Sequence, residues 1–284
     1  MSHHRTQPPT ILLDTLFSSD APLEHLSLYS TTDDVQAPSP TVDDESRPWV
    51  TLTFAQSLDA KIAGEAGKQL ILSGKESMLM THWMRSMHDA ILVGIGTALN
   101  DNPQLNTRLL PQLPADNPHR YHLPRPVVVD THLRLRLDCK LLNNYRAGVG
   151  RRPWVMSSAP IGEAEGKTWR EQRKALEDAG ARVVEVGADS GGISIPSMLA
   201  VLRSLGVRSL MVEGGAGIIK SFLAAATADN VGETVDALIV TVAPTFVGRE
   251  GVGYGENLLA AEVPRLRHKH TEIVGQDTVV AFRL

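Results

Sequence analysis

Short apolar segments alternate with amphipathic segments along most of the chain. The apolar segments are rich in β-branched residues, which is typical of strands covered on both faces; they lie at 90–95, 127–129, 153–156, 182–186, 207–212 and 235–242. Helical spacing of apolar residues predicts helices at 74–87, 167–179, 196–205 and 217–226. Because strands and helices alternate, the sequence predicts an α/β fold with a mixed, mostly parallel sheet flanked by helices.

The two ends of this body carry strands of a different kind. In 49–55 the apolar residues Val50, Leu52 and Phe54 alternate with threonines, which indicates a strand. We expect this strand and the last one, 278–284, to add antiparallel pairing. Three further segments precede the first helix, namely an extended segment, a loop and a short strand, at 57–63, 64–68 and 70–72.

The first helix, 74–87, has a recognisable start and an apolar face. Ser73 is placed to cap it, and Glu76 follows three residues later, as in a capping box. Its apolar face is rich in methionine, which favours packing against the core. Residues 18–47 are dominated by Ser, Thr, Asp and Pro and bury little. We therefore expect an N-terminal extension, 1–47, with a short helix near 10–17, and one domain over 48–284.

The strand predicted at 90–95 ends in a glycine-rich, polar segment. Gly94 and Gly96 carry no side chain, so the backbone can approach another group closely. Hydrogen-bonding side chains follow at Thr97, Asp101, Asn102, Asn106, Thr107 and Arg108. Ligands of open α/β sheets bind at the carboxyl ends of strands, so this segment is predicted to line a ligand crevice. The alternative is a turn that only connects two elements.

A second glycine-rich strand end lies near residue 213. Here a strand is followed by a glycine turn and a helix, with Glu213, Gly214, Gly215, Ala216 and Gly217 in succession. The start of a helix offers free N–H groups and the positive end of its dipole, which suits a pyrophosphate. Glu213 is predicted to point into the crevice. The alternative is a tight turn with a solvated acid.

Four further charged residues are candidates for the same site. Arg85 and Arg108 are placed to converge on one phosphate through bidentate hydrogen bonds, although a single arginine is more often a solvated surface residue. Asp59 and Lys61 lie on one face of an extended segment, where they hold a substrate or only each other.

Composition narrows the class of protein. The 284 residues carry a formal charge of −4, so neither nucleic acid nor a membrane surface is expected as a partner. No apolar run approaches the ~20 residues of a membrane helix, and the N-terminus lacks a signal-peptide pattern. The single cysteine, Cys139, excludes an intrachain disulfide and a cysteine-based zinc site. We expect a cytoplasmic protein without a metal.

Three motifs together resemble a known family. They are the run 54–63 (FAQSLDAKIA), the residues Thr97, Asp101, Asn102, Pro103, Leu105 and Arg108, and the run 212–215 (VEGG). In this order and spacing they resemble the riboflavin-biosynthesis reductases, in the stand-alone fungal form. The resemblance covers about 48–284 and implies a dihydrofolate-reductase-like α/β fold, NADPH as hydride donor and a homodimer. The implied reaction reduces the ribosyl side chain of a pyrimidinone ribosylamine 5′-phosphate to the ribityl chain.

The resemblance also implies roles for single residues. Contacts to NADPH are implied for Ala55, Thr97, Asp101, Ser157 or Ser158, and the run from Gly214 through Gly215, Ala216 and Gly217 to Ser221. Substrate contacts are implied for Gln69, Arg85, Leu105, Arg108 and Glu213. Lys61 is a candidate for the same role from its position beside Asp59. From their charge, Asp59 and Glu213 are candidates to stabilise an iminium charge or to relay a proton.

Three other functions are compatible with these patterns. One is another pterin or pyrimidine reductase of the same fold, such as a dihydrofolate reductase, although the paired arginines favour a phosphorylated substrate. A second is a nucleotide-binding protein without catalysis. A third is a Rossmann-type dehydrogenase, which the missing G-x-G-x-x-G fingerprint disfavours.

Overall fold

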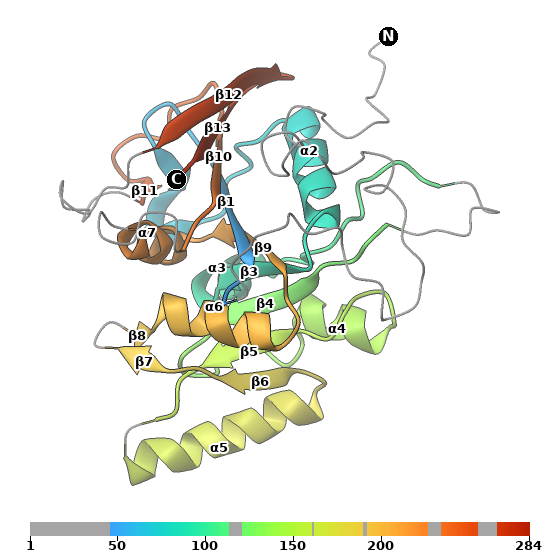
Figure 1. The fold of residues 1–284 in the computed structure, drawn as a ribbon, viewed down its shortest axis with the longest axis vertical. Helices are drawn as coiled ribbons and strands as arrows, with labels where there is room; N and C mark the ends of the chain where they lie inside the picture. Colours follow the sequence, from blue (N-terminus) through green and yellow to red (C-terminus); the bar gives the residue numbers. More distant parts are fainter. Residues whose placement is uncertain (1–45, 114–120, 161, 190–191, 227–233, 255–265) are drawn as a thin grey trace.

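The computed structural model describes residues 46–113, 121–160, 162–189, 192–226, 234–254 and 266–284. Nearly all of the predicted extension 1–47, with its helix near 10–17, lies outside them. The described residues form a nine-stranded sheet (Figure 1). Its order is β12 (Arg267–Val274), β13 (Asp277–Arg283), β10 (Ala237–Val242), β1 (Trp49–Gln56), β9 (Ser209–Gly214), β3 (Ala90–Gly94), β4 (Arg125–Val129), β5 (Trp154–Ser157) and β6 (Arg182–Glu185).

Helices cover both faces of this sheet (Figure 1). One apolar core joins the sheet to α2 (Lys75–Ser86), α4 (Lys140–Arg146) and α5 (Glu163–Asp178). The other joins it to α6 (Ile195–Ser204) and α7 (Ala216–Ala225). Successive strand residues face opposite sides, so both sets of side chains are buried. The predicted fold class, a mostly parallel sheet flanked by helices, is confirmed.

The pairing of the terminal strands differs in part from the prediction. β13 is antiparallel to β10, as predicted, but β1 is parallel to both β9 and β10. The alternating threonines suggested a strand with one solvated face. They are buried instead, because α2 covers that face, and His88 makes a hydrogen bond of 2.9 Å to the Thr51 hydroxyl. β1 is therefore a central strand.

Several local predictions are also corrected. The segment 70–72 is not a strand, since its backbone has no partner in a sheet. The polar segment predicted after β3 begins as the helix α3 (Ile95–Asp101), whose apolar residues Ile95, Ala98 and Leu99 follow helical spacing. The predicted extended segment 57–63 contains the short strand β2 (Lys61–Ala63). Elements that the pattern missed are α4, β12 and the short η2 (Glu65–Gly67), β7 (Ala188–Asp189), β8 (Gly192–Ile193) and β11 (Val252–Gly253).

The start of α2 is capped from a distance in sequence. Ser73 makes no capping hydrogen bond, and the N-cap position is Gly74. The Gly74 N–H donates to the Asp277 carboxylate at 2.8 Å, and Asp277 is 1% exposed. The hairpin of β12 and β13 thus supplies the acceptor that the helix start requires.

Replacing Asp277 by alanine is expected to lower the free energy of unfolding by about 1–2 kcal/mol, because a buried N–H loses its acceptor. Urea denaturation measures this. The matched control is Asp138→Ala, which removes an exposed ion pair to Arg136 and should cost less than about 1 kcal/mol. Equal losses for the two variants would contradict the capping role.

Candidate functional site

A cavity of about 550 Å³ opens at the carboxyl ends of β1, β3, β4 and β9. This is where ligands bind in open α/β sheets. Most of its wall is apolar. Its polar side chains come from Gln69, Ser73, Thr97, Asn100, Asp101 and Glu213.

The two glycine-rich strand ends meet in this cavity, as predicted. β3 and β9 pair in parallel, so both strands end at the same edge. Gly215 has a φ of 92°, and a Cβ atom there would lie 2.6 Å from Thr97 Oγ1. Thr97 Oγ1 in turn donates to the Gly214 carbonyl at 3.4 Å. Only a glycine fits this contact between the two strand ends.

The start of α7 forms one wall of the cavity. Gly215, Ala216 and Gly217 line it, as does Gly96 on α3. A Cβ atom at Gly96 or at Gly217 would meet nothing within 4 Å, so a ligand can approach the backbone at both positions. Free N–H groups of a ten-residue helix point towards this space. The residues present therefore fit the pyrophosphate of a dinucleotide.

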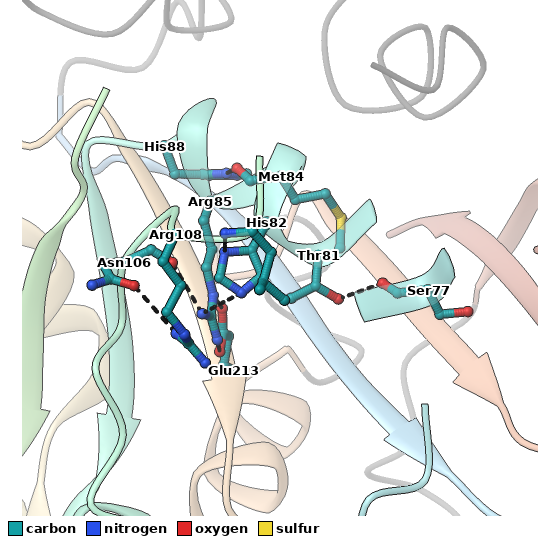
Figure 2. A network of polar contacts seen from close by, with 10 residues as sticks. Ser77, Thr81, His82, Met84, Arg85, His88, Asn106, Arg108 and Glu213 are labelled. Carbon is teal, nitrogen blue, oxygen red and sulfur yellow. Dashed lines mark hydrogen bonds and ion pairs between the residues drawn. The ribbon is translucent and has the colours of Figure 1, made fainter. Parts of the chain in front are cut away.

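Glu213 lies at an irregular point of β9. Leu92 pairs with Val212 and Val93 pairs with Gly214, so Glu213 is the extra residue of a β-bulge. Its carboxylate makes a bidentate ion pair with Arg85 of α2, with two N–O distances of 2.6 Å. Both side chains are largely buried, at 10% and 13% exposure. Figure 2 shows the pair, with Arg108 directed towards the same carboxylate.

The guanidinium of Arg85 is fully engaged within the protein. Besides Glu213, it donates to the Asn106 carbonyl at 3.1 Å and lies 3.4 Å from His82 Nε2. Arg108 is exposed and donates to the Asn106 amide oxygen at 3.2 Å. Desolvation, and then the charge of Arg85, lower the pKa of Arg108. The two arginines thus come together as predicted, but around a carboxylate.

Two buried histidines pack beside this pair and remain neutral. Burial, and then the charges of Arg85 and Arg108, lower the pKa of His82 to about 3. Burial lowers the pKa of His88 to about 4. His88 Nδ1 lies 2.7 Å from the Met84 carbonyl, so this nitrogen carries the proton. Arginine is therefore the source of positive charge around Glu213.

Asp101 is the second carboxyl group in the cavity wall. It lies at the end of α3, is half-buried, and its pKa is raised by desolvation. Of the other residues expected to contact a cofactor, Ala55, Thr97 and the run Gly215–Gly217 line the cavity. Gln69, expected to contact substrate, lines it as well.

Other expected site residues lie outside the cavity wall. The hydroxyl of Ser157 is buried, donates to the Thr131 carbonyl at 2.9 Å and accepts from Trp169 Nε1 at 3.0 Å. Leu105 is 2% exposed and belongs to the core. Asp59 accepts hydrogen bonds from Ser57 and from a distant loop. Lys61 lies in β2, next to residues 62 and 63 of the wall.

The residues that the sequence did not reveal are mainly apolar. No pattern separates such residues from the core; they are Phe54, Ile62, Leu70, Ile71, Met78, Val129 and Val252. His82 was also missed. The sequence does contain a signal for it: His82 precedes Arg85 by three residues, which places both side chains on one face of α2.

The chain matches the model of the RibD C-terminal domain over residues 48–280. The chain belongs to this family. The 2,5-diamino-6-ribosylamino-4(3H)-pyrimidinone 5′-phosphate reductase of Eremothecium gossypii is 34% identical over 257 residues, which are 88% of this chain and 95% of that protein. The reductase of the same name from Methanothermobacter thermautotrophicus is 31% identical, over 83% of this chain and 98% of its own.

Solved structures support the same assignment. The riboflavin biosynthesis reductase Rib7 of Saccharomyces cerevisiae is 26% identical, with a TM-score of 0.62 over 86% of this chain and 93% of its own. RibD of Acinetobacter baumannii shares the fold at 23% identity, with a TM-score of 0.65 over 84% of this chain and 58% of its own.

Within the described ranges, no helix could cross a membrane. The described residues also contain no group of three His, Cys, Asp or Glu side chains placed to hold a metal.

Replacing Arg85 by methionine is expected to lower the free energy of unfolding by about 3–5 kcal/mol, because Glu213 would stay buried without a counter-charge. Urea denaturation measures this loss. The double variant Arg85→Met/Glu213→Gln removes both charges, so its loss should be smaller than the sum of the single losses. The control is Arg136→Met at an exposed pair, which should cost less than about 1 kcal/mol. Additive losses would show that the pair does not act as a unit.

Proposed function

We propose that this protein catalyses the NADPH-dependent reduction of 2,5-diamino-6-ribosylamino-4(3H)-pyrimidinone 5′-phosphate, converting its ribosyl side chain to a ribityl chain in riboflavin biosynthesis. Relatives with this name align over most of the chain. The observation that carries the proposal is the cavity itself. It combines a glycine-lined helix start with a carboxylate that is fixed by an arginine.

The helix start suits the dinucleotide. A nicotinamide cofactor supplies the hydride in this class of reaction. Its pyrophosphate fits the N–H groups of Gly215 to Gly217. Ala55 near the end of β1 and Thr97 in the first turn of α3 line the same cavity. The choice of NADPH over NADH follows the family resemblance.

The ion pair of Arg85 and Glu213 suits the substrate of the reaction. The ring-opened and protonated ribosylamine is an iminium ion, which accepts the hydride and becomes a neutral amine. A fixed carboxylate nearby stabilises the positive charge of this iminium ion. Glu213 is such a group, because two hydrogen bonds to Arg85 hold both of its oxygens. Arg85 has little capacity left for a phosphate, so Arg108 is the arginine that we assign to the 5′-phosphate. Exposed guanidinium N–H groups suit this contact.

Asp101 is the group that we assign to proton transfer. Reduction of an imine requires a proton as well as a hydride. Asp101 lines the cavity, and desolvation raises its pKa, which favours the protonated acid that can donate. Asp59 is poorly suited, because hydrogen bonds, chiefly from Ser57, lower its pKa to about 2.

We also propose that the protein forms a homodimer, as the family resemblance implies. The sheet ends at β12, an eight-residue edge strand in the described part of the chain. An exposed edge strand offers backbone groups that can pair with a second copy.

The test of the proposed function is the oxidation of reduced nicotinamide cofactor, followed by absorbance. Purified protein is supplied with the phosphorylated pyrimidinone or with dihydrofolate, each with NADPH and with NADH. We expect turnover that depends on the phosphorylated pyrimidinone and is faster with NADPH. Turnover of dihydrofolate alone would indicate another reductase of this fold. Binding of NADPH without turnover would indicate a non-catalytic nucleotide-binding protein.

Replacing Asp101 by asparagine is expected to lower kcat by about 10²–10⁴-fold, because the group that donates the proton is lost. In the unmodified protein, kcat should fall as the pH rises through the raised pKa of Asp101, since only the protonated acid donates. The variant should lose this pH dependence. A variant that keeps kcat, or that loses only cofactor affinity, would contradict proton transfer by Asp101.

A further inference from the structure

The Asp59 carboxylate joins two segments that are far apart in sequence. Its Oδ1 accepts hydrogen bonds from the Ser57 hydroxyl at 2.5 Å and from the Val247 N–H at 3.1 Å. Its Oδ2 accepts from the Gly248 N–H at 2.7 Å. Gly248 has a φ of 89°, which turns two successive N–H groups towards one anion. Ser57, Asp59, Val247 and Gly248 form what we call the Asp59 clamp.

The clamp lies at the base of β2. Ser57 N–H donates to the Lys61 carbonyl at 2.9 Å, and Lys61 N–H donates to the Ser57 hydroxyl at 3.0 Å. These two bonds close the turn that leads from β1 into β2. The same hydroxyl thus contacts the Asp59 carboxylate and the first residue of β2.

On its other side, the clamp holds the loop that leads into β11. Leu58 N–H donates to the Thr245 carbonyl at 2.8 Å, which adds a backbone contact to the same loop. A Cβ atom at Gly251 would lie 2.9 Å from Lys61 Cγ, so the stem of Lys61 packs directly on this backbone. β11 then pairs with β2, Val252 opposite Ala63.

β2 and β11 together form part of the cavity wall. Ile62, Ala63 and Val252 line it, whereas Asp59 does not. A change at Asp59 therefore reaches the cavity through the two strands. Phe54 and Tyr254 continue the same contact beyond β11, with ring centroids 4.6 Å apart.

We propose that Asp59 is a positioning residue, whose clamp on the Val247–Gly248 backbone fixes β2 and β11 and so shapes the wall that receives the nicotinamide cofactor and the substrate. This role replaces the catalytic one expected from its charge. The inference rests on the proposed function for its effect on turnover, but not for its effect on the loop.

The chemistry of the carboxylate agrees with a positioning role. Three donors hold it as an anion, chiefly the Ser57 hydroxyl, and they lower its pKa to about 2. A depressed pKa means that the clamp is complete above the ordinary pKa of an aspartate, near 4, and is lost only as the pH falls towards 2. Between pH 5 and pH 9, titration of Asp59 should therefore cause neither a rise nor a fall in kcat/KM.

Two variants open the clamp from different sides. Asp59→Asn replaces an accepting oxygen by an NH₂ group, which cannot accept from a backbone N–H. Ser57→Ala removes the hydroxyl but keeps the charge of Asp59. The control is Asp138→Asn, which removes an exposed carboxylate and leaves both residues of the Arg249–Glu250 bond unchanged. Circular dichroism confirms that each variant is folded.

The first readout is trypsin cleavage after Arg249, which is next to the clamp, measured from the mass of the fragment. It needs no turnover, so it separates failure of the clamp from failure of the proposed function. We expect faster cleavage in Asp59→Asn and Ser57→Ala than in Asp138→Asn or the unmodified protein. Equal cleavage rates in all four proteins would overturn the clamp.

The second readout is steady-state kinetics, which shows whether each variant changes KM or kcat. The dissociation constant of NADPH is measured in parallel. We expect KM and the dissociation constant to rise about fivefold to tenfold in both variants, while kcat at saturation falls by less than about threefold. The double variant should be no worse than the worse single variant, because both act on one clamp. A large loss of kcat with unchanged KM would show instead that Asp59 touches the reacting atoms, and additive effects would show that the two residues act separately.

Discussion

The site depends on the parallel pairing of β3 with β9, because this pairing brings two glycine-marked strand ends to one edge of the sheet. The contact between Gly215 and Thr97 leaves no room for a side chain. It places the start of α7 against the start of α3, with open space over Gly96 and Gly217. The packing of two strands therefore creates a helix start with accessible N–H groups, which is the feature that a dinucleotide requires.

A second constraint is electrostatic and lies at the same end of β9, at Glu213. The bulge at Glu213 and the face of α2 that carries Arg85 meet in a bidentate ion pair with little exposure to water. Such a pair needs good geometry to offset the desolvation of both charges. Two neutral histidines, His82 on α2 and His88 just after it, leave the arginines as its source of positive charge. The cavity wall thus carries a helix start suited to anions and, next to it in sequence, a fixed negative charge.

The sequence predicted most strands of the sheet, the helices α2, α5, α6 and α7 and the junction of the two glycine segments, because these depend on local apolar patterns and on glycine. It did not reveal that β1 is central, since the threonines are covered by a helix that is distant in sequence. The cap on α2 was assigned to Ser73, but Asp277 provides it from 203 residues away. Among the site residues, their charge made Asp59 and Glu213 equal candidates for catalysis. Only tertiary contacts distinguish them, because Asp59 binds a loop and Glu213 lies in the cavity wall.

The central claim, that the contact at Gly215 builds the dinucleotide site, is tested most directly by binding. The dissociation constant of NADPH is measured by fluorescence titration for the unmodified protein, Gly215→Ala and Gly148→Ala. Gly148 also has a positive φ, of 69°, but a Cβ atom there meets nothing within 4 Å. We expect NADPH to bind about tenfold or more weakly to Gly215→Ala and equally well to Gly148→Ala, because only the Gly215 substitution displaces the strand ends. Equal affinity in all three proteins would contradict it.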